Sequence, residues 1–311
     1  MPDIVAIGEA MIEFNEEPDG RYAQGFGGDT SNAAIAAARL GASVRYVTLV
    51  GQDRFGDTLM ALWRGEGVDT EFVGRHPTAP TGVYFVNHTA AGHAFTYLRA
   101  GSAASRMTAD DVPQAALAGA KFVHVSAISQ AISKQARNAL KLVATGTEQD
   151  GCKDMHGRFA LSYDTNLRLK LWPLDEARAV IAETAARADI VKTSIEDAAL
   201  LTGLADPDAV ADHYLAAGPQ LVVVTLGAAG VLVATPAKRI KLAAHKVNAV
   251  DATGAGDAFA GALLARLAAA DEPFSAARFA NAAAALATSG YGAVAPLPHR
   301  EAVERLLKQI P

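Results

Sequence analysis

The chain has very little cysteine and no long apolar run. A single cysteine, Cys152, stands among 311 residues, which excludes a disulfide within the chain and is typical of a reducing compartment. No uninterrupted apolar stretch approaches the roughly 20 residues that a membrane-spanning helix needs. The formal net charge is −5 and no basic stripe stands out, so neither a membrane nor a nucleic acid is expected as a partner.

The first residues also lack the features of a targeting segment. Asp3 and Glu9 flank a short apolar run, whereas a signal peptide has a positively charged start and a transit peptide is poor in acids. We therefore expect a cytoplasmic protein.

Short β-rich runs alternate with longer Ala- and Leu-rich stretches over most of the sequence. This alternation is typical of βαβ units, which build a mainly parallel sheet with helices on both faces. The expected strands are 4–7, 44–49, 122–125, 159–163, 190–191 and 221–225. The expected helices are 30–40, 58–66, 134–145, 174–188, 195–202 and 206–217.

Two stretches, 13–26 and 81–97, interrupt this rhythm and lack helical periodicity. Each is typical of antiparallel strands inserted into the α/β body. We expect the two to pair as a small sheet over one edge of the main domain. Such a sheet would serve as a lid that excludes water, as a surface for dimer contacts, or as both.

The segment 251–257, DATGAGD, is a glycine-rich turn that precedes a long apolar helix. Unpaired N–H groups at a helix start, together with the positive end of the helix dipole, favour a phosphate or a developing anion. A carboxylate in that turn, Asp257, is suited to take a proton from an attacking hydroxyl. The alternative is that Asp257 is only a favourable charge in the first turn of the helix.

Two familiar phosphate-binding patterns are absent. The chain has no G-x-x-x-x-G-K-[ST] segment and no protein-kinase set of glycine-rich loop, HRD and DFG. A second glycine pair, Gly27 and Gly28, opens a helix beside Asp29 and Asn32. A ligand can approach the backbone closely at such a pair, although two glycines alone are more often a turn.

Taken together, the segments 25–41 (GFGGDTSNAAIAAARLG) and 251–261 (DATGAGDAFAG) resemble the two signature regions of the ribokinase (PfkB) family of carbohydrate kinases. Further matching segments, 50–57, 67–70 and 225–230, lie between them in the same order. The resemblance implies a Rossmann-like α/β domain with a β-sheet lid. On this basis the main domain comprises 1–12, 28–78 and 106–311, and the lid insertions are 13–27 and 79–105.

Within this family the chain is most similar to kinases of the sugar acid 2-keto-3-deoxygluconate, in segments 7–14, 25–30, 97–103 and 164–172. In those kinases the arginines that match Arg99 and Arg168 meet the substrate carboxylate. This agrees with physical chemistry, because a planar guanidinium binds a carboxylate through two hydrogen bonds. The alternatives are that Arg99 is a solvated strand charge and that Arg168 pairs with Asp164.

The resemblance also implies roles for the remaining site residues. Asp257 is expected to be the base, with the N–H groups of Gly254, Ala255 and Gly256 as the anion hole. The sugar pocket is expected to contain Gly28, Asn32, Tyr84, Tyr97, Arg99, Arg168 and Asp257. The nucleotide site is expected to contain Asn166, Ser194, Thr225, Gly227, Gly230, Gly254, Gly256 and Asn281.

Two cations are implied in addition to ATP. Glu196 is expected to hold water on Mg²⁺, in a segment where Ser194 replaces the asparagine that the family usually shows. Asp251 and Thr253 are expected to frame a monovalent cation such as K⁺. The charged stretch 146–158 is expected to be a surface loop without an assigned function.

The expected activity is thus transfer of a phosphoryl group from ATP to the 6-hydroxyl of the keto acid by a homo-oligomer, either a dimer formed through the lid or a higher assembly. Fructokinase, ribokinase and 5-dehydro-2-deoxygluconokinase activities are the enzymatic alternatives. A sugar- or nucleotide-sensing protein without catalysis is the alternative of another class.

Overall fold

A large sheet forms the centre of the molecule in the computed structural model, which describes residues 1–89, 92–149 and 159–309. The strand order is β13-β12-β11-β10-β9-β8-β1-β4-β5, and all pairs from β11 to β5 are parallel, whereas β12 runs antiparallel to both neighbours. The strands are β1 (Ile4–Ile7), β4 (Val44–Gly51), β5 (Val73–His76), β8 (Phe122–Ser126), β9 (Ala160–Asp164), β10 (Ile190–Ser194), β11 (Leu221–Thr225), β12 (Val231–Ala234) and β13 (Arg239–Leu242). The expected mainly parallel sheet is confirmed.

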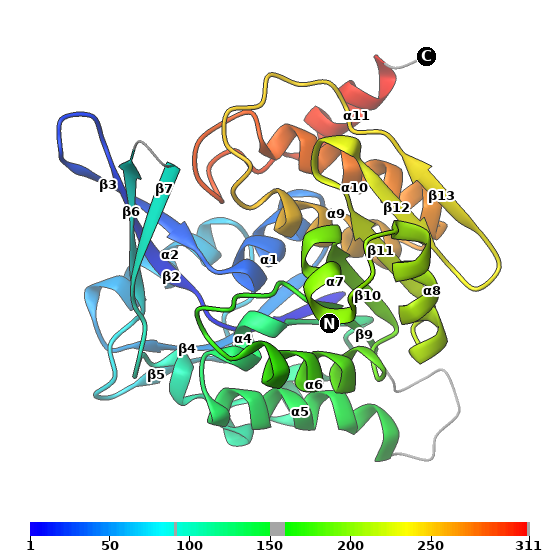
Figure 1. The fold of residues 1–311 in the computed structure, drawn as a ribbon. Coiled ribbons are helices and arrows are strands. Elements are labelled where there is room, and N and C mark those ends of the chain that lie inside the picture. Colours follow the sequence, from blue (N-terminus) through cyan, green and yellow to red (C-terminus); the bar gives the residue numbers. More distant parts are fainter. Residues whose placement is uncertain (90–91, 150–158, 310–311) are drawn as a thin grey trace.

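Helices cover both faces of this sheet (Figure 1). One face carries α1 (Asp29–Arg39), α2 (Arg54–Gly65), α9 (Ala255–Ala268), α10 (Pro273–Ala287) and α11 (Arg300–Lys308). The other carries α3 (Gln114–Leu117), α4 (Ala127–Ala131), α5 (Lys134–Gln149), α6 (Leu174–Ala185), α7 (Ile195–Thr202) and α8 (Pro207–Ala217). Each face of the sheet packs against its helices in a separate hydrophobic core. Successive β1 residues point to opposite faces, so Ile4 lies in the core beside α1 and Val5 in the core beside α5. This explains why the strands read as continuous apolar runs.

None of the helices within the described ranges is long and apolar enough to cross a lipid bilayer. Helix α5 continues to Gln149, beyond the expected end at residue 145, so the first residues of the expected 146–158 loop are helical. Cys152 lies outside the described residues.

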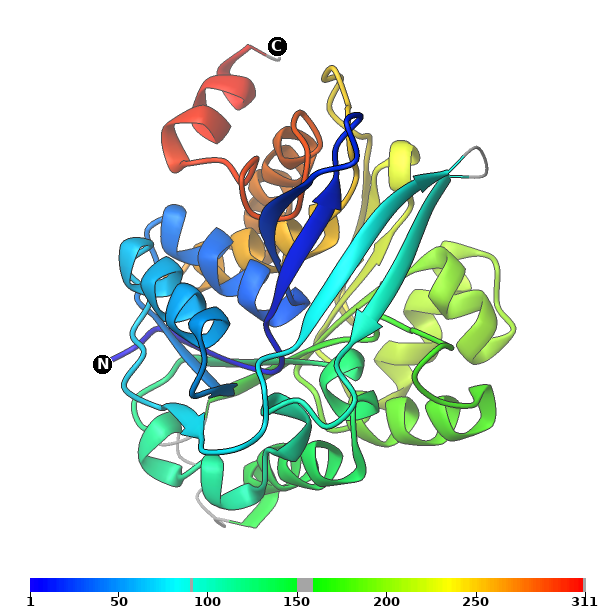
Figure 2. The same cartoon turned by 90° about the vertical axis from the view of Figure 1, so that its left-hand side faces the viewer.

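A second, smaller sheet stands away from one side of the main body (left in Figure 1, front in Figure 2). Its strand order is β3-β2-β6-β7, from β2 (Met11–Glu16), β3 (Tyr22–Gly27), β6 (Val83–Thr89) and β7 (Gly92–Leu98). The two hairpins are antiparallel, but β2 and β6, which join them, run parallel. The two insertions therefore pair as expected. The strands that join them, β2 and β6, are parallel because both run away from the main body. The exact domain bounds remain a prediction.

Helices α1 and α9 lie side by side, parallel and in close contact. A Cβ added at Gly261 would overlap the carbonyl oxygen of Ala33 and lie 2.8 Å from Cβ of Ala36. One turn earlier, Asn32 hydrogen-bonds Asp257. This approach places the starts of the two glycine-opened helices together at one end of the sheet.

Candidate active site

A cavity of about 800 Å³ lies between the small sheet, the starts of α1 and α9, and the carboxyl ends of the central strands. Ligand sites in open α/β sheets occur at this edge. The expected site residues that line it are Gly28, Asn32, Tyr84, Tyr97, Arg99, Asn166, Arg168, Ser194, Thr225, Thr253, Gly254, Gly256 and Asp257. Residues that are far apart in the sequence thus meet in one place.

Asp257 lies in the first turn of α9, and its Oδ2 accepts a hydrogen bond of 2.8 Å from Nδ2 of Asn32. Burial, followed by the negative charge of Asp29, raises the pKa of Asp257 to about 7. A base whose pKa lies near neutral pH is well matched to proton abstraction from an alcohol. The role of Asp257 as a base stays a prediction.

The glycine turn before α9 has the backbone that an anion site needs. Gly254 adopts φ 75°, a left-handed conformation that glycine tolerates best. Gly254 and Gly256 line the cavity, whereas Ala255 does not, and the N–H of Ala255 donates to the carbonyl of Ala252 at 3.2 Å. Of the three N–H groups expected in the anion hole, that of Ala255 thus already has an acceptor.

Lys192, in the middle of β10, was missed by the sequence analysis and lies beside this turn. Its Nζ is 2.7 Å from Oδ2 of Asp164, and a Cβ added at Gly256 would lie 3.2 Å from the same Nζ. Both Lys192 and Asp164 are buried and line the cavity. The ammonium of Lys192 is thus held beside the start of α9 by the carboxylate of Asp164.

The small sheet supplies one wall of the cavity through Tyr84 and Tyr97, whose rings stack with centroids 5.6 Å apart. The Tyr84 hydroxyl donates to the buried Glu13 carboxylate, and a side chain at Gly27 would overlap the Tyr84 ring. Gly28 adopts φ 113°, and a Cβ there would overlap the backbone of Glu9. The glycine pair therefore lets the ring and the backbone close around a ligand.

The two arginines of the expected carboxylate site have different surroundings. Nη2 of Arg99 donates to Oε2 of Glu9, which is buried, and Arg99 itself is only 11% exposed. Nη1 of Arg168 donates to the carbonyl of Leu167 at 2.8 Å. Asp164 pairs with Lys192 and not with Arg168, so that alternative for Arg168 is wrong.

Part of the expected nucleotide site lies away from the cavity. Asn166, Ser194 and Thr225 line it. Gly227 and Gly230 flank the short turn after β11, and a Cβ at Gly230 would overlap the carbonyl of Leu242. Asn281 donates to the carbonyl of Ala243 at 2.8 Å, so it joins α10 to the segment that follows β13.

The acidic residue beside Ser194 that faces the cavity is Asp197, whereas Glu196 does not line it. Oδ2 of Asp197 accepts from the N–H of Leu167 at 3.0 Å, and burial raises the pKa of this carboxyl. Counting three residues on from Ser194, the spacing of the family's N-x-x-E segment, would have found Asp197. Within the described ranges no group of three or more His, Cys, Asp or Glu side chains could hold a metal.

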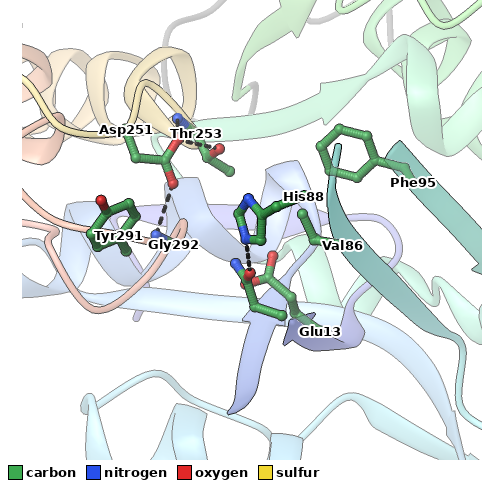
Figure 3. A pocket seen from close by; sticks show the side chains of 9 residues that line it. Glu13, Val86, His88, Phe95, Asp251, Thr253, Tyr291 and Gly292 are labelled. Atoms are coloured by element: carbon green, nitrogen blue, oxygen red, sulfur yellow. Dashed lines mark hydrogen bonds between the residues drawn. The ribbon is translucent and has the colours of Figure 1, made fainter. Parts of the chain in front are cut away.

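Asp251 and Thr253 adjoin a second, smaller cavity of about 10 Å³ between the small sheet and the 291–292 turn (Figure 3). Oδ1 of Asp251 accepts from the backbone N–H and hydroxyl of Thr253 at 2.9 and 2.7 Å. Oδ2 accepts from the N–H of Gly292 at 3.0 Å. This carboxylate ties the turn before α9 to the turn after α10.

Known proteins with the same fold and similar sequence identify the family. The family described as pfkB family carbohydrate kinase matches residues 1–300. The 2-dehydro-3-deoxygluconokinase of Thermoproteus tenax is 34% identical over 321 residues, which cover 100% of this chain and 95% of that protein. The probable fructokinase-4 of Arabidopsis thaliana is 33% identical over 322 residues, covering 98% and 96%.

Among solved structures, the fructokinase of Vibrio cholerae O395, in a form with bound fructose, ADP and calcium ion, is similar throughout. It has a TM-score of 0.88 and 30% sequence identity, and the match covers 99% of each chain. The glycine turn with its acid, the lid-like sheet and these similarities agree, and the chain belongs to the pfkB family of carbohydrate kinases.

Proposed function

We propose that this carbohydrate kinase transfers the terminal phosphoryl group of ATP to the primary 6-hydroxyl of 2-keto-3-deoxygluconate. The observation that carries the proposal is that Arg99 and Arg168 line the same cavity as Asp257. An acid substrate in a partly dry cavity is well served by guanidinium groups. The similarity to the Thermoproteus tenax enzyme supports the same substrate.

In the proposed reaction Asp257 removes the proton of the 6-hydroxyl while this oxygen forms a bond to the terminal phosphorus. The bond from that phosphorus to the bridging oxygen breaks, and ADP leaves. Gly254 and Gly256 direct the helix start at the transferring group, and Nζ of Lys192, held by Asp164, is a hydrogen-bond donor there. Preorganised donors of this kind supply much of the rate enhancement of phosphoryl transfer.

Mg²⁺ is expected to enter with the nucleotide and to shield its phosphate charge. Mg²⁺ prefers oxygen ligands and keeps several waters, so it needs only one or two protein carboxylates. Asp197 in the cavity fits this demand through water, whereas the sequence favoured its neighbour Glu196. K⁺ beside Asp251 and Thr253 stays a prediction.

Product analysis tests the proposal. The protein, incubated with ATP, Mg²⁺ and the keto acid, should release ADP and form one phosphate monoester, which ³¹P NMR with proton coupling places on the terminal carbon. Absence of turnover, or a phosphate on another carbon, would contradict the proposal.

Fructose is the second candidate substrate, because a fructokinase is about as similar to the chain as the keto-acid kinase. A neutral sugar has no carboxylate for the charge of Arg168 to meet. Fructose should therefore be the poorer substrate.

Replacing Arg168 by alanine should raise KM for the keto acid by about 10- to 100-fold, the effect of losing one hydrogen bond to a charged group. KM for ATP should change little, because Arg168 is assigned to the sugar. Steady-state kinetics with each substrate varied in turn measures both constants. Arg300→Ala, on the distant helix α11, is the control; an effect of Arg168→Ala on ATP alone would refute the assignment.

The pH dependence of kcat/KM for the sugar should report the ionisation of Asp257. The base acts when deprotonated, so the rate should fall as the pH drops below about 7, the pKa of Asp257. The negative charge of Asp29 opposes that ionisation, so Asp29→Asn should move the acid limb to lower pH. An acid limb that stays in place in Asp29→Asn would contradict the assignment of the limb to Asp257.

A further inference from the structure

Apart from Lys192, which pairs with Asp164, the cationic side chains that line the cavity lie in two regions with different surroundings. Arg99 follows β7 at the base of the small sheet and is paired with Glu9. Arg168 and Lys170 lie on the loop after β9. The two regions therefore present different net charges to a ligand.

Glu9 is a built-in partner of Arg99. Its carboxylate is 1% exposed, with Oε2 accepting from Nη2 of Arg99 and Oε1 accepting from the hydroxyl of Ser102 at 3.1 Å. Burial raises the pKa of Glu9, while Arg99 and Ser102 act in the opposite direction. Arginine is always protonated in proteins, so the ionised pair has no net charge.

Arg99 nevertheless keeps hydrogen-bonding capacity for a ligand. Its Nε is buried and has no hydrogen-bond partner among the described residues, and its guanidinium lies 5.6 Å from the ring centroid of Tyr97. A buried donor without a partner is costly, and an oxygen of the ligand would satisfy it. A hydroxyl or carbonyl oxygen serves this donor as well as a carboxylate does.

Arg168 and Lys170 are exposed, and neither forms an ion pair within the part of the chain that the structure describes. Arg168 acts on the half-buried Asp197 only at longer range, where its charge favours the ionised carboxylate. The 168–170 loop therefore brings two cationic side chains to the cavity that no carboxylate of the described residues holds in an ion pair.

We propose that Glu9 cancels the charge of Arg99, and that Arg168 and Lys170 make the cavity selective for an acid over a neutral sugar. Arg99 then positions an uncharged oxygen of the ligand, and Glu9 sets how strongly this end of the cavity favours an anion. That the anion is the keto acid rests on the proposed function. The distribution of charge in the cavity is independent of that function.

Glu9→Gln is the primary test, because glutamine can still hydrogen-bond Arg99 and Ser102 but carries no charge. At about pH 8 and low salt, the ratio of kcat/KM for the keto acid to kcat/KM for fructose should rise about fivefold. The rise should shrink in about 1 M salt, which screens the uncovered charge. Glu304→Gln, which removes the partner of Arg300 on α11, is the matched control. A ratio that stays constant or falls in Glu9→Gln would overturn the proposal.

Two double variants decide the question even if Glu9→Gln does not fold. Arg168→Gln/Lys170→Gln should lower the ratio at least about tenfold. Glu9→Gln/Arg99→Gln removes a pair without net charge, so its ratio should stay within about twofold of the wild type even if both rates fall. Equal losses of selectivity in the two double variants would overturn the proposal.

Failure of the proposed function would look different. In that case the wild type would not turn over the keto acid at all. D-gluconate, added as an inhibitor of phosphorylation of the best neutral sugar, would then be the anionic probe. Its inhibition constant should fall in Glu9→Gln and rise in Arg168→Gln/Lys170→Gln, and the opposite pattern would overturn the charge assignment.

Discussion

Asp257→Asn should lower kcat by about 10²- to 10⁴-fold, the usual contribution of a positioned general base. Asparagine has nearly the same shape as aspartate, and its oxygen can still accept from Nδ2 of Asn32. Binding of ATP should therefore persist, so the loss belongs to the chemical step. Single-turnover kinetics at saturating substrates measures it, with Asp175→Asn on the exposed surface of α6 as the control. A rate within tenfold of the wild type would refute the role of Asp257.

The same variant should become more stable than the wild type at neutral to alkaline pH. Folding raises the pKa of Asp257 from 3.8 to about 7, so the folded state keeps a proton that the unfolded state has already released. The wild type loses stability as the pH rises through this window, and asparagine does not. Thermal unfolding at about pH 5 and about pH 8 should show that the stability advantage of Asp257→Asn over the wild type grows with pH. A variant that is inactive because it is misfolded would show no such advantage.

Lys192→Met should lower kcat by about 10²- to 10³-fold, the effect of removing one preorganised donor from a charge-stabilising site. Lys192 lies beside the glycine turn, and its Nζ is the partner of the buried Asp164. The variant should also lose about 3–5 kcal/mol of stability, because the buried Asp164 loses its counter-charge. Urea unfolding and single-turnover rates measure the two effects separately.

A double variant separates catalysis from structure. Lys192→Met/Asp164→Asn removes both charges of the pair, so most of the lost stability should return. The rate should stay low, because the Nζ donor beside Gly256 is still missing. Recovery of kcat in the double variant would show that Lys192 has only a structural role.

Much of the fold could be predicted from the order of the segments. The glycine breaks at 227 and 230 separate β11 from β12, and the strands β1 and β11 begin and end as expected. The parallel pairing of β2 with β6 was not predicted, because it depends on how two distant hairpins leave the body. Strand β13 was also not predicted, since Arg239–Leu242 is only four residues long and two of them are charged.

Candidate site residues that belong to one local sequence motif could be predicted. Those that reach the cavity only through the pairing of distant segments were missed. Asp257 and its glycines stand in one local segment. Lys192 looks like an interior strand residue, and it meets the cavity only because β9 and β10 pair in register with Lys192 opposite Asp164. Glu9, which follows β1, becomes a partner of Arg99 only when the chain returns from the small sheet. Charged residues at the carboxyl ends of predicted parallel strands were the signal that could have found both.

Comparison of substrates tests the account most directly. The purified enzyme, with ATP and Mg²⁺, is assayed by coupled ADP release against 2-keto-3-deoxygluconate, its galacto epimer, fructose, ribose and 5-dehydro-2-deoxygluconate. The account predicts that kcat/KM for a 2-keto-3-deoxy acid exceeds that for fructose by at least about 100-fold, the contribution of about 3 kcal/mol from charged hydrogen bonds. Equal or greater kcat/KM for fructose or ribose would contradict it.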